Sequence, residues 1–118
     1  MRLFHGSSED SLKKICRFGF NRSYCGKNGV ALGHGVYFAV NSQYSNSYAG
    51  TTTTNMKCMI RAMVLVGDSC VGNSSMKIPP EKSNGTGQLY DTTTDGYKTV
   101  FVAYHDNQCY PEYLIYYN

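Results

Sequence analysis

The stretch GHGVYFAVNSQYSNSY, residues 33–48, joins a buried strand to a polar segment. Its first part contains the apolar run VYFAV, which is typical of a strand buried on both faces. Its second part has the polar start and small residues of a short capped helix. Tyr37, Tyr44 and Tyr48 fall on these two elements. The sequence leaves two explanations open: ordinary packing with the hydroxyls at the surface, or two rings that sandwich a flat ligand.

The chain around this stretch predicts an α+β fold in which strands dominate. Residues 3–5, LFH, have the pattern of a strand end. Apolar runs predict further strands at 57–66, 88–95, 99–106 and 112–117. The run at 57–66 is also compatible with a buried helix, because the apolar pattern alone does not separate the two. Residues 21–35 and 72–87 are rich in glycine, serine and asparagine, which is typical of loops. A mostly antiparallel sheet in two layers, with one or two short helices, is therefore the expected architecture.

The first helix is predicted directly after residues 3–5. Ser7 or Ser8 is a suitable N-cap, because a serine side chain accepts a hydrogen bond from an amide of the first turn. Gly19 is expected to end the helix in a left-handed conformation. The apolar face of this helix is predicted to consist of Leu12, Ile15 and Cys16.

Length and charge narrow the possible classes of protein. The 118 residues predict a single domain, 1–118, with its own core. The net charge is +3, from 11 Lys and Arg against 8 Asp and Glu, and the basic residues are spread along the chain. This charge permits a phosphate-bearing substrate or a nucleic acid without favouring the latter. No segment approaches the roughly 20 apolar residues of a membrane span, and no signal peptide is recognisable.

The five cysteines are an odd count and form no C-x-x-C pair, which favours neither a zinc site nor a disulfide framework. We expect them to be buried free thiols in an intracellular protein, cytoplasmic or nuclear, with no metal. They are Cys16, Cys25, Cys58, Cys70 and Cys109. Nothing around Cys25 indicates the lowered pKa of a nucleophile.

His5 is the first candidate for a functional side chain. A histidine at a strand end is often a structural residue, but here Gly6 and Ser7 follow, and a glycine lets a ligand approach the backbone closely. The glycines before residue 36 do not form a dinucleotide fingerprint, because the strand follows them instead of preceding them. Glu112 lies beside a strand without a paired carboxylate, so a solvated edge position is expected for it.

Three segments together resemble the catalytic domain of poly(ADP-ribose) polymerase-type ADP-ribosyltransferases, closest to the mono-ADP-ribosylating, macrodomain-containing branch. They are LFHGSS at 3–8, ICRFGFNRSYCGKNGVALGHGVYFAVNSQYS at 15–45 and TVFVAYHDNQCYPEYLI at 99–115. The resemblance covers nearly the whole chain in order. It implies a split, mostly antiparallel sheet that encloses NAD+, which is the substrate.

The resemblance also implies roles for single residues. His5 is expected to hold a ribose hydroxyl on the adenine side, and the Gly6 backbone to hold the nicotinamide amide. Tyr37 and Tyr48 are expected to form the two walls of the nicotinamide slot, and Ser45 to bind the carboxamide oxygen between them. Tyr44 is expected to lie outside the site and to have an ordinary packing role. Residues 21–33 match the loop over the donor. The implied NAD-binding set is His5, Gly6, Ser7, Asn21, Tyr37, Ala39, Ser45 and Tyr48.

Val100 is the departure from the family pattern with the largest expected consequence for activity. It occupies the third catalytic position beside His5 and Tyr37, where polymer-forming members have a glutamate, and Glu112 falls one strand later. Valine cannot polarise an acceptor hydroxyl, so chain growth is expected to fail. Transfer of one ADP-ribose remains possible if the acceptor carboxylate assists the departure of nicotinamide. The alternative is a catalytically inactive module that binds NAD+ or ADP-ribose.

The chain starts almost at the first motif, whereas family members usually carry a preceding strand and helix. Two explanations stay open: a minimal natural transferase or a trimmed chain. The expected partners are NAD+ and an acceptor protein, the chain itself included. A nucleic-acid end is an alternative acceptor that the charge does not favour. We expect a monomer without a membrane partner.

Overall fold

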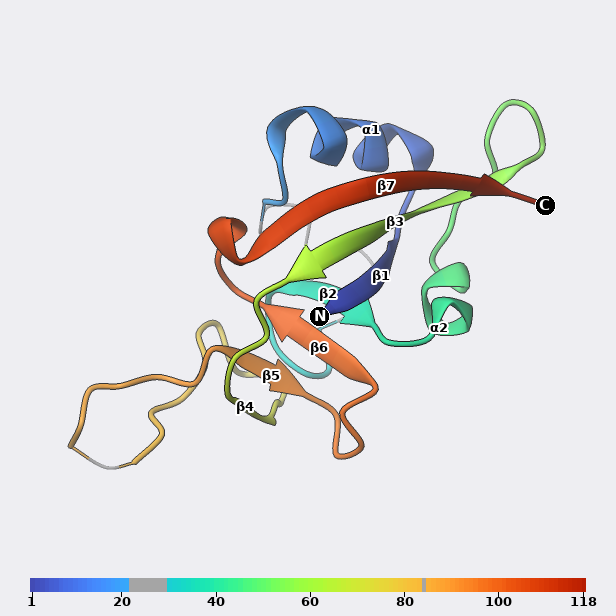
Figure 1. Ribbon diagram of the computed structural model, residues 1–118. Helices are drawn as coiled ribbons and strands as arrows, with labels where there is room; N and C mark the ends of the chain where they lie inside the picture. The colour runs from blue at the N-terminus through green and yellow to red at the C-terminus, as the bar shows by residue number, and fades with distance from the viewer. Residues whose placement is uncertain (22–29, 84) are drawn as a thin grey trace.

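The computed structural model describes residues 1–21, 30–83 and 85–118. Within these ranges seven strands form one sheet in the order β4-β5-β6-β2-β1-β3-β7 (Figure 1). All neighbouring strands are antiparallel except β4 and β5. The strands are β1 (Arg2–Gly6), β2 (Val36–Ala39), β3 (Lys57–Val64), β4 (Ser69–Val71), β5 (Thr92–Thr94), β6 (Val100–Ala103) and β7 (Cys109–Tyr117). The α-helices are α1 (Glu9–Phe18) and α2 (Ser42–Asn46), and the 3₁₀ helix η2 (Asp106–Gln108) precedes β7. The predicted α+β class is confirmed.

The sheet is split between β1 and β2. These strands pair at one position only, Phe4 with Ala39, whereas β1 pairs with β3 along its whole length and β2 pairs with β6 along its whole length. The sheet therefore consists of two parts. We call β1, β3 and β7 the β3 half-sheet, and β2, β4, β5 and β6 the β6 half-sheet. The predicted split sheet is confirmed by this single-pair junction.

Helix α1 begins and ends where the sequence predicts. Of the two candidate serines, Ser8 is the N-cap, and its side chain accepts a hydrogen bond from the Ser11 amide at 3.2 Å. Gly19 is the C-cap with φ +87°, and its amide donates to the Ile15 carbonyl at 2.8 Å. Neither described helix is long and apolar enough to cross a membrane.

The buried face of α1 differs from the prediction at one residue. Leu12 and Ile15 are buried as expected, but Cys16 is exposed and Ser11 is the third buried residue. Each residue turns a helix by about 100°, so the residue after Ile15 leaves its face, whereas the residue four positions earlier shares it. Helix α1 lies over the β3 half-sheet and contacts β3 and β7 (Figure 1).

The hydrophobic core lies between α1 and the sheet and continues under both half-sheets. It contains side chains from α1 and from β1, β2, β3 and β6, so most of the predicted strands contribute to it. Its buried members are Leu3, Leu12, Ile15, Phe20, Val36, Phe38, Cys58, Ile60, Ala62, Val64, Val66, Phe101 and Ala103. Helix α2 packs against β1 and β2, next to the junction of the half-sheets.

The cysteines are free thiols, as predicted, in the part of the chain that the structure describes. Only Cys58 is fully buried; Cys16 is exposed, and Cys70 and Cys109 are half-buried. The expectation of uniformly buried thiols is therefore wrong, because Cys16 lies on the outer face of α1, Cys70 on the edge strand β4 and Cys109 at the start of β7. Burial raises the pKa of Cys109 to about 12, which keeps this thiol protonated and unreactive at neutral pH. Cys25 lies outside the described residues.

Candidate functional site

The site lies where β1 and β2 separate. Beyond the pair of Phe4 and Ala39, antiparallel register would bring Gly6 opposite Tyr37, but the strands do not pair there. Instead the His5 ring spans the gap, and its Nδ1 lies 2.7 Å from the Tyr37 carbonyl oxygen. The two half-sheets are thus joined at this point by a side chain, and the backbone of Gly6 is not used by β2.

The hydrogen bond to Tyr37 determines the tautomer of His5. A carbonyl oxygen only accepts, so Nδ1 carries the proton, and Nε2 of the neutral ring presents a lone pair. Burial lowers the pKa of His5, and the bond to the Tyr37 carbonyl raises it but offsets only part of this effect. Phe20 and Phe38 hold the ring at centroid distances of 5.5 and 5.6 Å. His5 is therefore an oriented, neutral hydrogen-bond acceptor at neutral pH.

Gly6 is required by the packing of α2 against β1. A Cβ at Gly6 would lie 2.0 Å from the Ser45 carbonyl oxygen, which is far closer than any real Cβ contact. Ser45 is only 2% exposed, and its hydroxyl has no hydrogen-bond partner among the described residues. The close approach of the two backbones therefore places Ser45 directly beside Gly6 of β1.

Tyr37 projects from β2 and is fixed by its hydroxyl. The hydroxyl accepts a hydrogen bond from the Leu32 amide at 2.8 Å and donates one to the Gly33 carbonyl at 2.9 Å. The half-buried ring is thus tied to the segment that leads into β2. Tyr37 takes part in the site at two points, through this ring and through the carbonyl that binds His5.

Tyr44 and Tyr48 form an aromatic pair on α2 and the turn that follows it. Their ring centroids are 5.4 Å apart, and their hydroxyl oxygens are 3.5 Å apart. Burial raises the pKa of Tyr44, and the hydrogen bond with Tyr48 and the charges of Tyr37 and Asp95 raise it further. Tyr44 thus packs against Tyr48, and packing is the role that the sequence analysis left for it. The i, i+4 spacing of the two tyrosines was the signal for this contact.

Val100 lies at the junction on the side of β6. It pairs with Ala39, which in turn pairs with Phe4, and both Val100 and Ala39 are buried. The nearby carboxylate of Asp95 accepts hydrogen bonds from the amides of Thr99 at 2.8 Å and Val100 at 3.4 Å. Burial alone would raise the pKa of Asp95, but the hydrogen bonds from Thr99, Val100 and Tyr97 together outweigh it, and the pKa is lowered. This acid holds the β5–β6 turn.

A family model of the poly(ADP-ribose) polymerase catalytic domain matches residues 1–118. The chain belongs to this family. It is 47% identical over 120 residues to protein mono-ADP-ribosyltransferase PARP14 of Homo sapiens, and 39% identical over 117 residues to protein mono-ADP-ribosyltransferase PARP10 of Mus musculus. These alignments cover 97% and 96% of this chain. The chain spans only 7% and 12% of the length of the two relatives.

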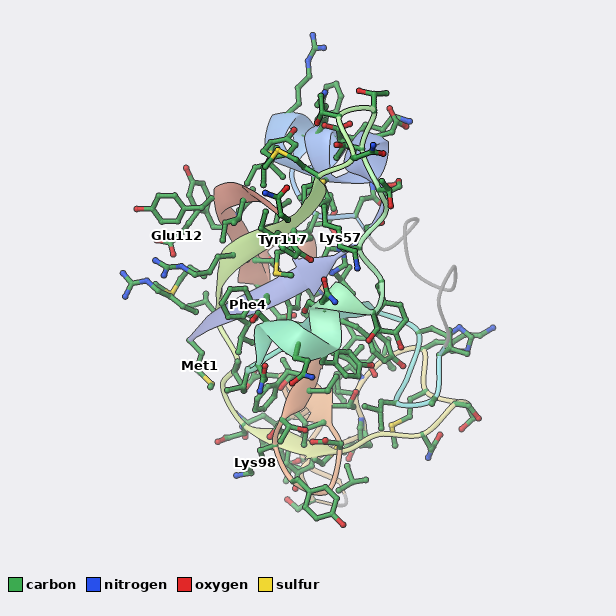
Figure 2. The ribbon with its side chains drawn as sticks, turned by 90° about the vertical axis from the view of Figure 1, so that its right-hand side faces the viewer. Met1, Phe4, Lys57, Lys98, Glu112 and Tyr117 are labelled. Atoms are coloured by element: carbon green, nitrogen blue, oxygen red, sulfur yellow. The ribbon has the colours of Figure 1, made fainter. Side chains whose placement is uncertain are left out.

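Glu112 lies on β7 in the β3 half-sheet, whereas Val100 lies on β6 in the other. Its carboxylate pairs with the Arg2 guanidinium at 3.3 Å. Figure 2 shows Glu112 at the edge of the molecule, away from α2. The two residues therefore lie on different strands and in different half-sheets, and the third catalytic position at Val100 stays a prediction.

Two residues of the predicted set lie outside this cluster. Ser7 follows Gly6 and is half-buried, and its carbonyl accepts a hydrogen bond from the Gly50 amide at 3.2 Å. Asn21 lies after α1 and lines a cavity of about 540 Å³ together with Tyr104 and residues 105–107. Residues 22–29, most of the predicted donor loop, lie outside the described ranges. No cluster of three or more potential metal ligands occurs within 1–21, 30–83 and 85–118.

Proposed function

We propose that this chain is a mono-ADP-ribosyltransferase that binds NAD+, releases nicotinamide and transfers one ADP-ribose to a side chain of an acceptor protein. The observation that carries the proposal is the junction of β1 and β2, at which His5, Gly6, Tyr37 and Ser45 meet. Membership of the poly(ADP-ribose) polymerase family supports it, as do the relatives named protein mono-ADP-ribosyltransferase.

In this proposal the neutral Nε2 of His5 accepts a hydrogen bond from a ribose hydroxyl. The free backbone edge of Gly6 and the uncommitted hydroxyl of Ser45 bind the nicotinamide carboxamide, which offers one acceptor and two donor hydrogens. Tyr37 and Tyr48 flank the flat ring. Ser7, Asn21 and Ala39 complete the proposed NAD-binding set, and the net charge of +3 suits the two phosphates.

The proposed reaction breaks the bond between the ribose carbon and the nicotinamide nitrogen. The electron pair of this bond leaves with nicotinamide, which loses its positive charge, and the ribose develops oxocarbenium character. A nucleophilic oxygen of the acceptor, such as a carboxylate, then forms the new bond to the same carbon. His5 and the Gly6–Ser45 pair act by holding the donor in place.

Val100 supports a limit of one unit per acceptor. Elongation needs a group that activates a hydroxyl of the previous ADP-ribose, and a buried valine opposite Ala39 has neither charge nor hydrogen-bonding atoms. The same residue also favours the second candidate, an inactive module that binds NAD+ or ADP-ribose without cleaving it. The free cysteines among the described residues support an intracellular location, and we propose that the chain acts as a monomer.

The test is incubation of the chain with phosphate-labelled NAD+ and a mixture of acceptor proteins, with nicotinamide release measured in parallel. We expect single-unit adducts on the acceptors or on the chain itself, equal amounts of released nicotinamide, and loss of both in His5→Ala. Glu112→Gln is the control variant and should keep both. Tight NAD+ binding in calorimetry without nicotinamide release would instead establish the inactive module. Labelled, terminally phosphorylated RNA in the same reaction tests the alternative acceptor.

A further inference from the structure

We propose that Thr93 and Tyr104 are positioning residues that hold the Tyr37 ring in place through the backbone of Leu32 and Gly33. The inference rests on the proposed function, in which Tyr37 forms one wall of the nicotinamide slot. Neither residue belongs to the NAD-binding set. Their effect on NAD+ is expected to pass through the segment that precedes β2.

Three paired residues lie at the same level of the β6 half-sheet. Thr93 on β5 pairs with Val102 on β6, and Val102 pairs with Tyr37 on β2. Side chains of directly paired residues point to the same face of a sheet, so Thr93 and Tyr37 share a face with one strand between them. The Leu32–Gly33 backbone connects the two hydroxyls on this face.

The Leu32–Gly33 backbone is bound from both sides. On one side, the Tyr37 hydroxyl accepts from the Leu32 amide at 2.8 Å and donates to the Gly33 carbonyl at 2.9 Å. On the other, the Thr93 hydroxyl donates to the Leu32 carbonyl at 2.8 Å. The Tyr104 hydroxyl also lies 3.4 Å from the Leu32 carbonyl oxygen, but the Thr93 contact is the shorter of the two, so Thr93 donates to Leu32 and accepts from the Tyr104 hydroxyl at 2.7 Å. These five residues therefore form one continuous hydroxyl–backbone network.

The network is packed without free space, so a shift at one end is passed on to the other. Gly33 has φ +131°, and a Cβ there would lie 1.9 Å from the Tyr104 hydroxyl oxygen. A Cβ at Gly72 would lie 1.9 Å from the Leu32 carbonyl oxygen. Thr93 is 0% exposed and Tyr104 is 1% exposed, so water cannot replace a missing hydroxyl at either position without a rearrangement. Movement of Leu32 must then move Tyr37, whose carbonyl also binds His5.

The adjacent residue provides a matched control. Thr92 is also 0% exposed, and its hydroxyl donates to the Val66 carbonyl at 3.0 Å. Adjacent residues of a strand point to opposite faces, so Thr92 lies on the face opposite to Thr93. Thr92→Val and Thr93→Val therefore each remove one buried hydroxyl from the same strand, but only Thr93→Val removes a bond to Leu32.

The test compares NAD+ binding of wild type, Thr93→Val, Thr93→Ser and Thr92→Val by calorimetry. We expect Thr93→Val to raise the dissociation constant by about tenfold, the scale of one lost buried hydrogen bond. Thr93→Ser keeps the hydroxyl and should bind NAD+ within about twofold of wild type. Thr92→Val should also bind within about twofold of wild type, although its free energy of unfolding should fall by about as much as that of Thr93→Val. Equal weakening by Thr92→Val and Thr93→Val, or unchanged binding in Thr93→Val, would overturn the proposal.

A second measurement is independent of NAD+. Urea unfolding of Tyr37→Phe, Thr93→Val and the double variant should show non-additive losses of stability, whereas Tyr37→Phe with Thr92→Val should be additive. Additive behaviour in the first cycle would contradict the network. If wild type does not bind NAD+ while the first cycle shows coupling, the proposed function fails and the network that couples Thr93 to Tyr37 is retained.

Discussion

The two half-sheets are held together by different kinds of interaction. In the β3 half-sheet, β3 and β7 have eight and nine residues, and β3 buries apolar side chains such as Ile60 and Val64. In the β6 half-sheet, β5 and β6 have three and four residues, and all three residues of β5 are buried threonines. The β3 half-sheet is stabilised mainly by apolar burial, whereas the β6 half-sheet combines the buried apolar residues of β2 and β6 with hydroxyl groups of β5 that bind specific backbone atoms.

Because of this difference, the stability of the fold and the exact geometry of the site depend on different parts of the molecule. Apolar contacts stabilise a fold without fixing directions closely, because many packings bury a similar area. Hydrogen bonds from buried hydroxyls fix which atoms meet, and a missing partner is costly. Substitutions in the β3 half-sheet should therefore reduce stability first, whereas substitutions in the β6 half-sheet and at the junction should also change the site.

The largest expected loss of stability is for a substitution in the apolar core under α1. Leu12→Ala removes a fully buried side chain of α1 and should lower the free energy of unfolding by about 2–5 kcal/mol. Urea unfolding measures this loss. Lys13→Ala, at an exposed position of the same helix, should change stability by less than about 0.5 kcal/mol. The folded fraction of Leu12→Ala should bind NAD+ like wild type, and weaker binding by this fraction would contradict the comparison.

The next largest effect is expected for a substitution at the junction of β1 and β2. Gly6→Ala places a Cβ 2.0 Å from the Ser45 carbonyl oxygen, so β1 and α2 must move apart. We expect a loss of about 1–3 kcal/mol in the free energy of unfolding and a larger relative loss of NAD+ binding than Leu12→Ala causes. Gly96→Ala is the matched control, because no described atom lies within 4 Å of its new Cβ and its φ is not positive. Equal effects of the two variants would show that the close approach at Gly6 is unimportant.

A smaller effect concerns the pH dependence of His5. Because its pKa is lowered from the ordinary value of 6.5, the folded ring is still neutral where an unfolded histidine begins to protonate. Its contribution to stability is complete above pH 6.5 and is lost as the pH falls through the lowered pKa. NAD+ binding should weaken over the same range, since Nε2 then carries a proton. Titration of the histidine Cε1 protons by NMR measures this, and a His5 midpoint at or above 6.5 would contradict it.

The smallest effect is expected for Glu112→Gln. Glu112 forms an ion pair with a largely exposed arginine, and such pairs contribute about 0–1 kcal/mol. NAD+ binding and ADP-ribose transfer should remain within about twofold of wild type, in keeping with that energy. Single-turnover assays give the transfer rate. A loss of transfer comparable to that of His5→Ala would show that Glu112, and not Val100, is the third residue of the site.

Local sequence patterns predict the elements well where a single physical cause dominates. The apolar run at 57–66 contains β3, Ser8 caps α1, and Gly19 ends it with a positive φ. In each case the cause lies within a few residues: burial of a continuous run, satisfaction of a free amide, or a conformation that favours glycine. The resemblance of separated motifs predicted the family, which the match over residues 1–118 confirms.

What could not be predicted depends on contacts between distant residues. Thr93 and Leu32 are 61 positions apart, and no local pattern indicates that their backbone and hydroxyl meet. Sequence reasoning explained Gly6 by ligand approach, whereas the structure adds the contact with Ser45. The exposure of Cys16 followed from helix geometry but was obscured by its apolar character. Register across strands, which pairs Ala39 with Val100, is likewise determined by the complete sheet.

The order of the strands also has a consequence for folding of the chain. Strand β2 at 36–39 pairs with β6 at 100–103, and β3 at 57–64 pairs with β7 at 109–117. Both half-sheets therefore need a strand that the ribosome makes long after its pairing partner. Closing such long loops precedes the gain from pairing, so we expect refolding on a timescale of about milliseconds to seconds. Until β7 emerges, one edge of the apolar β3 stays open, and the nascent chain is prone to aggregation during that interval.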